Sequence, residues 1–243
     1  MSKPTHREVK IPSITARFLA DFMAAGSRER ARRSIIQGCK YRSTARVIQH
    51  NEAKAIITNF VTSENPQIDE LIAKSAWIKA KLADDPFEAE VNKHNGDYVA
   101  RFADIFPSLV MPDAALSDAQ DMPTLTLAGV RISVEMQFRL RRVTKTNKVR
   151  IGGAMLRYAK GKPLPLPAGE WQSAYLFGYL GVIQFEAEAQ PEQKLCITID
   201  AQSGNVIPAP SNSVERFKEM EAACATIAER WPNVDPPTGA ILA

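Results

Sequence analysis

Apolar side chains recur every three to four residues through most of the first 110 residues, the spacing that places them on one face of an α-helix. The first such segment carries Ile14, Phe18, Leu19 and Phe22 and stops at Gly26, a residue common at helix ends. Pro, Asn and Asp residues separate several of the later segments. This pattern predicts helices over residues 14–25, 28–42, 43–62, 67–83 and 86–105.

From residue 131 the period changes to two. Apolar and polar residues alternate over residues 131–143, which predicts a strand with one buried face. A polar turn at 144–148 leads into a second predicted strand over 149–159, so the two are expected to form a β-hairpin. Gly152 and Gly153 lie inside the second strand, where glycines indicate a bulge or the close approach of another backbone.

The remaining pattern predicts further elements: a helix over 170–186, a short strand over 194–199 with a continuation at 206–207, and a helix over 214–230. Strands confined to the second half of a chain are typical of the α+β class. The sequence therefore predicts an N-terminal helical region followed by a β-β-α-β-α core with a small mixed sheet. The expected divisions are a helical region at 1–110, the core at 124–231 and a poorly ordered tail at 232–243.

The composition excludes several classes of protein. Hydrophobic residues make up 45% and charged residues 24% of the chain, which excludes wholesale disorder. The most apolar stretch, 174–185, is too short to span a bilayer, and the N-terminus carries no apolar run of signal-peptide length. Three dispersed cysteines and three histidines predict reduced, buried thiols in a cytoplasmic protein without a metal site. His50 and His94 are expected on exposed helix faces.

Charge is segregated along the chain although the net charge is only +4. Residues 136–169 hold nine Lys or Arg side chains and no acid, whereas residues 64–104 hold nine acids and five bases. A cationic hairpin can neutralise phosphates without reading base sequence. Contact with DNA or RNA is therefore expected, while an acidic protein surface, a small anion, or protection of an exposed strand edge from pairing are alternatives. The predicted phosphate contacts are Arg139, Arg141, Lys145, Lys148, Arg157 and Lys160.

One family resemblance covers about residues 124–208. The hairpin, helix and strand resemble the core of the PD-(D/E)XK nuclease superfamily, with Glu135 in place of the first acid and Gln172 and Tyr175 similar to a Gln–Tyr pair on the following helix. The resemblance implies that these three residues are the candidate catalytic groups and that Mg²⁺ would be the cofactor. The second strand departs from the family pattern, because Met155 and Arg157 stand where an acid and a lysine are needed.

The sequence thus predicts a nucleic-acid-associated protein with a nuclease-like, non-catalytic core and no cofactor. One alternative is an active Mg²⁺-dependent nuclease that uses Glu135 with Glu170 or Asp200. The other is a non-enzymatic module that docks a protein partner through the helical half or the helix around Val182 and Ile183.

Overall fold

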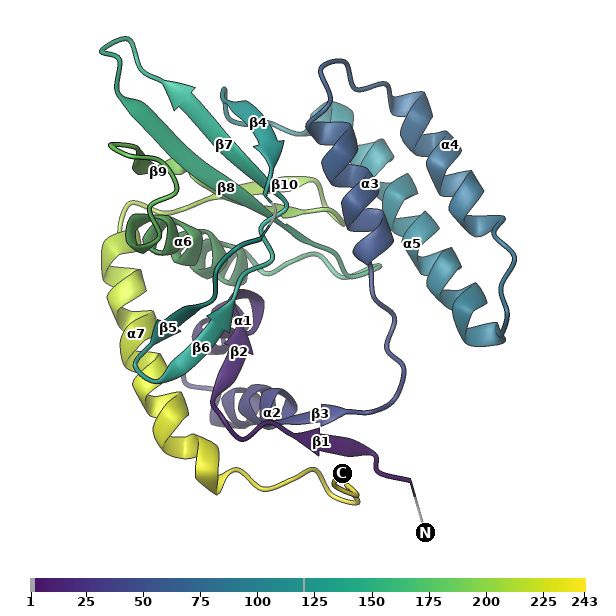
Figure 1. The fold of residues 1–243 in the computed structure, drawn as a ribbon, viewed down its shortest axis with the longest axis vertical. Helices are drawn as coiled ribbons and strands as arrows, with labels where there is room; N and C mark the ends of the chain where they lie inside the picture. The colour runs from purple at the N-terminus through teal and green to yellow at the C-terminus, as the bar shows by residue number, and fades with distance from the viewer. Residues whose placement is uncertain (1–2, 120) are drawn as a thin grey trace.

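A computed structural model describes residues 3–119 and 121–243 of the chain. Its first half contains strands as well as helices, and a strand is its first element (Figure 1). The elements are β1 (His6–Glu8), β2 (Ser13–Thr15), α1 (Ala16–Ala24), α2 (Glu29–Lys40), β3 (Tyr41–Ser43), α3 (Asn51–Val61), α4 (Ile68–Lys79), α5 (Pro86–Ile105), the 3₁₀ turn η1 (Phe106–Ser108) and β4 (Ala115–Asp118).

The second half contains the longest strands of the fold. Its elements are β5 (Leu125–Leu127), β6 (Val130–Ser133), β7 (Phe138–Val143), β8 (Val149–Arg157), α6 (Leu166–Val182), β9 (Gln190–Asp200), β10 (Asn205–Pro208), α7 (Ser213–Arg230) and the 3₁₀ turn η2 (Trp231–Asn233). The α+β class is confirmed. The predicted order, helices first and strands only afterwards, is not: β1 to β4 all precede residue 124.

A five-stranded mixed sheet in the order β10-β9-β8-β7-β4 is the centre of the fold. Strands β7 and β8 form the antiparallel hairpin, and β8 and β9 are parallel. Phe138, Leu156 and Ile197 pack with the apolar residues of α3, α4 and α5, while Met155 and Cys196 pack with those of α1, α6 and α7. Because helices cover both faces, the end of β8 is buried at consecutive positions instead of alternate ones.

The predicted strand over residues 131–143 is in fact two strands in different sheets. Strand β6 belongs to a three-stranded sheet with β2 and β5, and β7 begins again at Phe138. Met136, Gln137 and Phe138 are buried in succession, which breaks the alternation. The buried Gln137 side chain accepts a hydrogen bond from the backbone N–H of Leu156 at 2.7 Å. This bond satisfies the polar side chain at the point where the chain passes from one sheet to the other.

The glycine pair in β8 is explained by close packing. A Cβ on Gly152 would lie 2.1 Å from the backbone oxygen of Leu195, and one on Gly153 would lie 2.0 Å from the sulfur of Met136. The β8–β9 register also shifts between Ile151 and Gly153. The predicted bulge and close approach are both confirmed.

The two chain ends lie together (Figure 1). The backbone N–H of Thr5 donates to the Ile241 oxygen at 2.8 Å, and Lys40 Nζ donates to the Val234 oxygen at 3.1 Å. The tail was expected to be poorly ordered, but these hydrogen bonds attach it to the N-terminal segment. Strand pairing also crosses the expected division at residues 110–124, since β2 pairs with β6 and β4 with β7.

Candidate functional site

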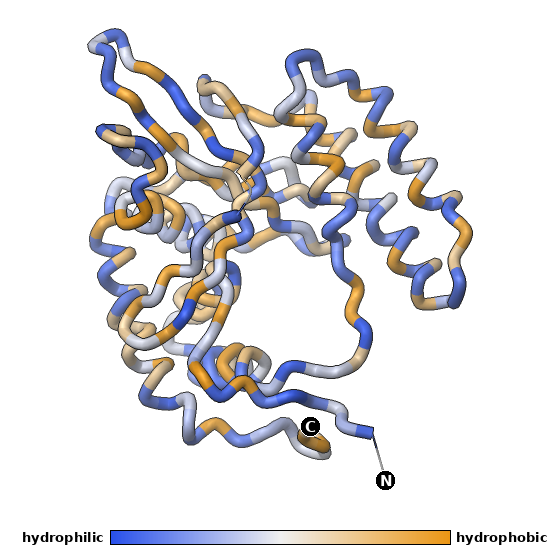
Figure 2. Tube along the Cα trace, in the orientation of Figure 1, coloured by the Kyte–Doolittle hydropathy of each residue, from blue (hydrophilic) through white to orange (hydrophobic). Residues whose placement is uncertain are grey.

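The turn of the β7–β8 hairpin presents two lysines to solvent. Lys145 and Lys148 are exposed, and their ammonium groups have no hydrogen-bond or ion-pair partner among the described residues. The backbone N–H of Thr144 donates to the Lys148 oxygen at 2.9 Å, and Asn147 adopts φ +57°, which closes the turn. The turn is hydrophilic (Figure 2). A short ordered turn therefore carries two uncompensated positive charges.

The arginines further along β7 have partners. Arg141 forms a bidentate ion pair with Glu186, at 2.8 Å for Nη2–Oε1 and 3.0 Å for Nε–Oε2. This hydrogen bonding lowers the pKa of Glu186. Arg139 lies 4.4 Å from the centroid of the Phe185 ring. Acidic and aromatic side chains from the loop after α6 thus partner positive charges that look unopposed in the sequence.

Arg157, at the end of β8, is buried within the fold. Its Nη2 donates to Asp21 Oδ1 at 2.8 Å and Oδ2 at 3.1 Å, and its Nη1 donates to Gln172 Oε1 at 2.8 Å. Burial lowers the pKa of Arg157, and the Asp21 carboxylate opposes that effect. The Nε2 of the fully buried Gln172 has no partner in the described structure. The structure therefore brings Arg157 into direct contact with Gln172, and also with Asp21 on α1, a residue that the sequence analysis missed.

The other predicted catalytic groups lie apart. Glu135 is on the crossing segment, with 61% of its side chain exposed, and pairs with Lys54 of α3. Tyr175 is completely buried on α6 and packs against Tyr179 and Phe217. Asp200, the acid of the nuclease alternative, accepts hydrogen bonds from the backbone of Leu164 and Gln202 and from a serine hydroxyl. Glu135 and Arg157 line a common cavity, and Arg157 and Asp200 line a hollow beside it.

That cavity has a volume of about 370 Å³ and lies where α1, the start of α3, α5 and the end of β8 meet. Arg17, Lys54, Arg157 and Glu135 are its charged lining residues, and Arg17 has no hydrogen-bond or ion-pair partner among the described residues. An adjacent hollow shares Arg17 and Arg157 and adds Lys162 and Asp200. Charged side chains from separate segments therefore meet at a site that no local motif reveals, and Arg17 is the uncompensated cation of the cavity within the described structure.

An aromatic cluster lines the same cavity. The rings of Tyr98 and Tyr158 stack at a centroid distance of 4.2 Å, and His50 lies edge-on to both at 5.4 and 5.6 Å. His50 was expected to be exposed, but it is half-buried. Burial, and then the charge of Lys54, lowers the pKa of His50.

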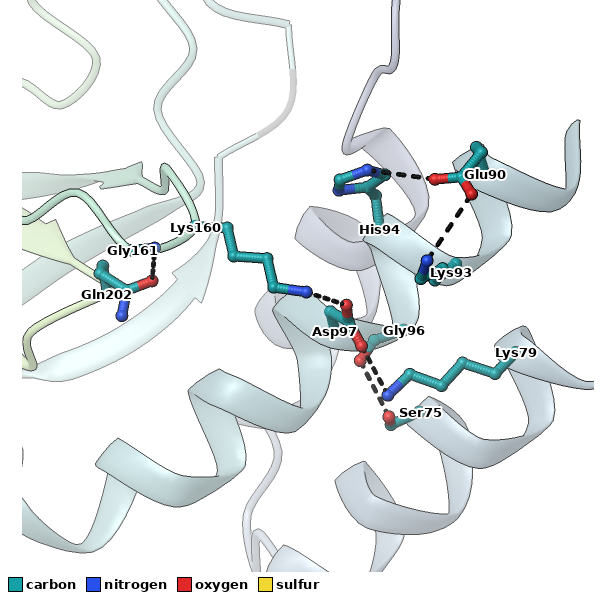
Figure 3. A network of polar contacts seen from close by, with 10 residues as sticks. All are labelled: Ser75, Lys79, Glu90, Lys93, His94, Gly96, Asp97, Lys160, Gly161 and Gln202. Atoms are coloured by element: carbon teal, nitrogen blue, oxygen red, sulfur yellow. Dashed lines mark hydrogen bonds and ion pairs between the residues drawn. The ribbon is translucent and has the colours of Figure 1, made fainter. Parts of the chain in front are cut away.

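Lys160 connects the end of the hairpin to the helices α4 and α5. Its Nζ lies 2.8 Å from Asp97 Oδ2, while Lys79 Nζ lies 2.7 Å from Asp97 Oδ1 (Figure 3). Hydrogen bonding from Lys160, and then from Lys79, lowers the pKa of Asp97. Nearby, the N–H of Gly161 donates to the side chain of Gln202 at 2.9 Å. Lys160 therefore links separate elements through an acid that is already shared with another lysine.

The Mg²⁺ implied by the family resemblance does not fit the residues present. Met155 is buried at the position that needs an acid, and Glu170 forms an ion pair with Arg216 at 2.9 Å. Among residues 3–119 and 121–243, no group of three or more His, Cys, Asp or Glu side chains could hold a metal ion. The three cysteines are free and buried, which confirms the expectation for them.

No protein-family model matches this chain, and no curated protein is significantly similar to it in sequence. Among the helices of the described residues, none combines the length and the apolar character needed to cross a membrane.

Proposed function

We propose that this chain associates with DNA or RNA through the phosphate backbone, and that its nuclease-like core does not hydrolyse the strand. The observation that carries the proposal is that Lys145 and Lys148, at an exposed and hydrogen-bonded turn, have no partner among the described residues. Each lysine that contacts a phosphate releases condensed counterions, which favours binding at low salt without selecting a base sequence.

The six predicted contacts differ in how readily they reach a phosphate. Arg139 is half-buried, with its guanidinium over the Phe185 ring. Lys145 and Lys148 can bind a phosphate without breaking any ion pair with the described residues. Arg141 and Lys160 are exposed but paired with Glu186 and Asp97, so a phosphate must replace a carboxylate at each. Exposed ion pairs are weak, which makes that exchange feasible. Arg157 is 9% exposed and holds Asp21, so in this proposal it supports the fold and is not a backbone contact.

Fluorescence anisotropy with labelled single- and double-stranded DNA and RNA, over about 50 to 200 mM salt, tests the proposal. The wild-type affinity should fall steeply with salt. The variant Lys145→Ala/Lys148→Ala should reduce the slope of log K against log[salt] by about 1.4 to 1.8, the sum for two phosphates. A matched control, Lys10→Ala/Lys218→Ala, removes two exposed lysines that likewise have no partner within the part of the chain described, and it should leave the slope nearly unchanged. Absence of binding at about 50 mM salt would refute the proposal.

The non-catalytic part has its own test. Prolonged incubation of the purified protein with single-stranded DNA or RNA and millimolar Mg²⁺ or Mn²⁺ should release no shortened product. Cleavage that disappears in Glu135→Ala would instead support the nuclease alternative.

A further inference from the structure

The cavity beside the end of β8 has the size of a small-molecule site. Its volume of about 370 Å³ falls within the roughly 300–1,000 Å³ typical of ligand pockets. Its lining residues come from α1, the segment before α3, α5 and the end of β8. It is distinct from the hairpin turn that carries the proposed function.

Two lining residues have buried polar atoms without a partner. The hydroxyl of Tyr98, a residue only 1% exposed, and Nδ1 of His50 make no hydrogen bond within the described structure. Most buried polar groups in proteins are paired, because an unsatisfied one loses its hydration without gaining a hydrogen bond. Their position beside the Tyr98–Tyr158 stack suits a ligand that combines a planar ring with hydrogen-bonding groups.

The charges around the cavity favour an anion. Three cations line it, but Lys54 is paired with the one lining carboxylate, Glu135, and Arg157 is paired with Asp21. Arg17 is exposed and unpaired among the described residues, and its charge contributes to lowering the pKa of both Arg157 and His50. Arg17 is therefore the lining cation whose charge a bound anion would neutralise.

We infer that this cavity binds one nucleoside phosphate, with the phosphate held by Arg17 and Lys54 and the base packed against Tyr158. Base–aromatic stacking supplies affinity for any base, because each base has a flat π-face. Tyr98 and His50 would then hydrogen-bond to polar groups of the base or sugar. The inference extends the proposed function, since the ligand is either a free nucleotide or the terminal residue of a bound strand.

Isothermal titration calorimetry of the full chain at pH 7 tests the inference with four probes: AMP, UMP, inorganic phosphate and a 5′-phosphorylated oligothymidylate. Both mononucleotides should bind more tightly than phosphate. If the free nucleotide is the ligand, the oligonucleotide should not compete with AMP. If a strand terminus is the ligand, a 5′-phosphorylated oligonucleotide should displace AMP, and the same oligonucleotide without the phosphate should do so poorly.

Three variants separate the contributions. Tyr158→Leu should weaken AMP binding at least about fivefold, the lower limit of a stacking contribution. Arg17→Ala should weaken the binding of AMP and of inorganic phosphate alike, because it removes a phosphate contact. Tyr98→Phe should weaken binding by several fold without loss of thermal stability, since the hydroxyl that it removes has no partner in the apo chain. Lys145→Ala/Lys148→Ala should leave AMP affinity unchanged, so this inference and the proposed function can fail separately.

A nuclear magnetic resonance titration of His50 measures its pKa, which reports the charge of the ligand and not only the packing of the cavity. The charged groups around His50 are Arg17, Lys54, Arg157 and Glu135 at the cavity and His94 on α5. A bound phosphate offsets the cations, so the pKa of His50 should rise on addition of AMP but not in the Arg17→Ala variant. No mononucleotide binding up to millimolar concentration, or equal affinities for AMP and phosphate with Tyr158→Leu unaffected, would overturn the inference.

Discussion

The two ends of the β7–β8 hairpin carry the same kind of charge in opposite settings. At the turn, Lys145 and Lys148 are exposed and unpartnered among the described residues, and nearby Arg141 pairs with an exposed carboxylate. At the other end, Arg157 is buried against Asp21 and Gln172, and Lys160 shares Asp97 with Lys79. Apart from Lys79, all of these cations belong to one acid-free stretch of sequence, residues 136–169.

A run of Lys and Arg residues in the sequence therefore does not by itself form a cationic surface in the fold. Burial turns an arginine into a structural link, whereas exposure leaves a lysine available to a phosphate. Substitutions should therefore destabilise the fold most at the buried end of the hairpin and least at the exposed end. Equal losses of unfolding free energy along the hairpin would contradict this difference.

Removing the carboxylate at the buried end should have the largest effect. Asp21→Ala leaves the Arg157 guanidinium buried without its counter-charge, and breaking such a pair costs about 3 kcal/mol. Chemical denaturation monitored by circular dichroism would measure the loss in unfolding free energy.

Two companion variants control this experiment. Asp21→Asn keeps a hydrogen-bond acceptor for Arg157 and should lose less stability. Asp21→Ala/Arg157→Met removes both charges and should be more stable than Asp21→Ala alone, because no unpaired buried charge remains. A loss below about 0.5 kcal/mol in Asp21→Ala would show that Arg157 reaches solvent and does not stabilise the fold.

Asp97 should show an intermediate effect. Its side chain is 21% exposed and accepts from two lysines, so Asp97→Asn should cost roughly 1 kcal/mol once solvent screening is taken into account. The folded pKa of Asp97 is lowered, which means that the unfolded chain takes up the proton first as pH falls. The stabilisation is therefore complete above the ordinary aspartate pKa of about 3.9 and is lost as pH falls through the folded value.

Denaturant titrations at several pH values between about 6 and 3 would check this dependence. Wild type should lose more stability than Asp97→Asn over that range. Asp104→Asn on the same helix is the matched control, because Asp104 is 70% exposed and its only ion pair, with Arg101 within the described residues, spans 4.0 Å. Equal losses of unfolding free energy in Asp97→Asn and Asp104→Asn would show that the ion pairs of Asp97 with Lys79 and Lys160 do not stabilise the fold.

Much of the secondary structure follows from the sequence, because helix and strand periods are local. The predicted segments over residues 86–105 and 214–230 correspond to α5 and α7 almost residue for residue. The run over 131–143 fails, since alternation alone does not show that Gln137 is buried at a crossing between sheets. Strands β1 and β3 were missed because each has three residues and depends on pairing with the other.

The candidate site was harder to predict, since its residues come from segments far apart in the chain. Arg17, His50, Tyr98 and Tyr158 meet only when α1, α3 and α5 pack beside the end of β8. Counting charges in residues 136–169 likewise misses Glu186, which lies outside that span. Asp21 did leave one signal: it is the only acid in the apolar segment of α1.

A substitution at the exposed end of the hairpin should change the unfolding free energy least, and its effect should appear in nucleic-acid binding. Glu186→Gln removes the acceptor that holds Arg141, a pair whose side chains are 39% and 47% exposed, so no measurable change in unfolding free energy is expected. The freed guanidinium should instead reach a phosphate, which steepens the slope of log K against log[salt] by up to about 0.9 in the anisotropy assay. Glu219→Gln, at an exposed α7 residue away from the hairpin, should leave that slope unchanged. If Glu186→Gln also leaves it unchanged, then Arg141 is not a backbone contact.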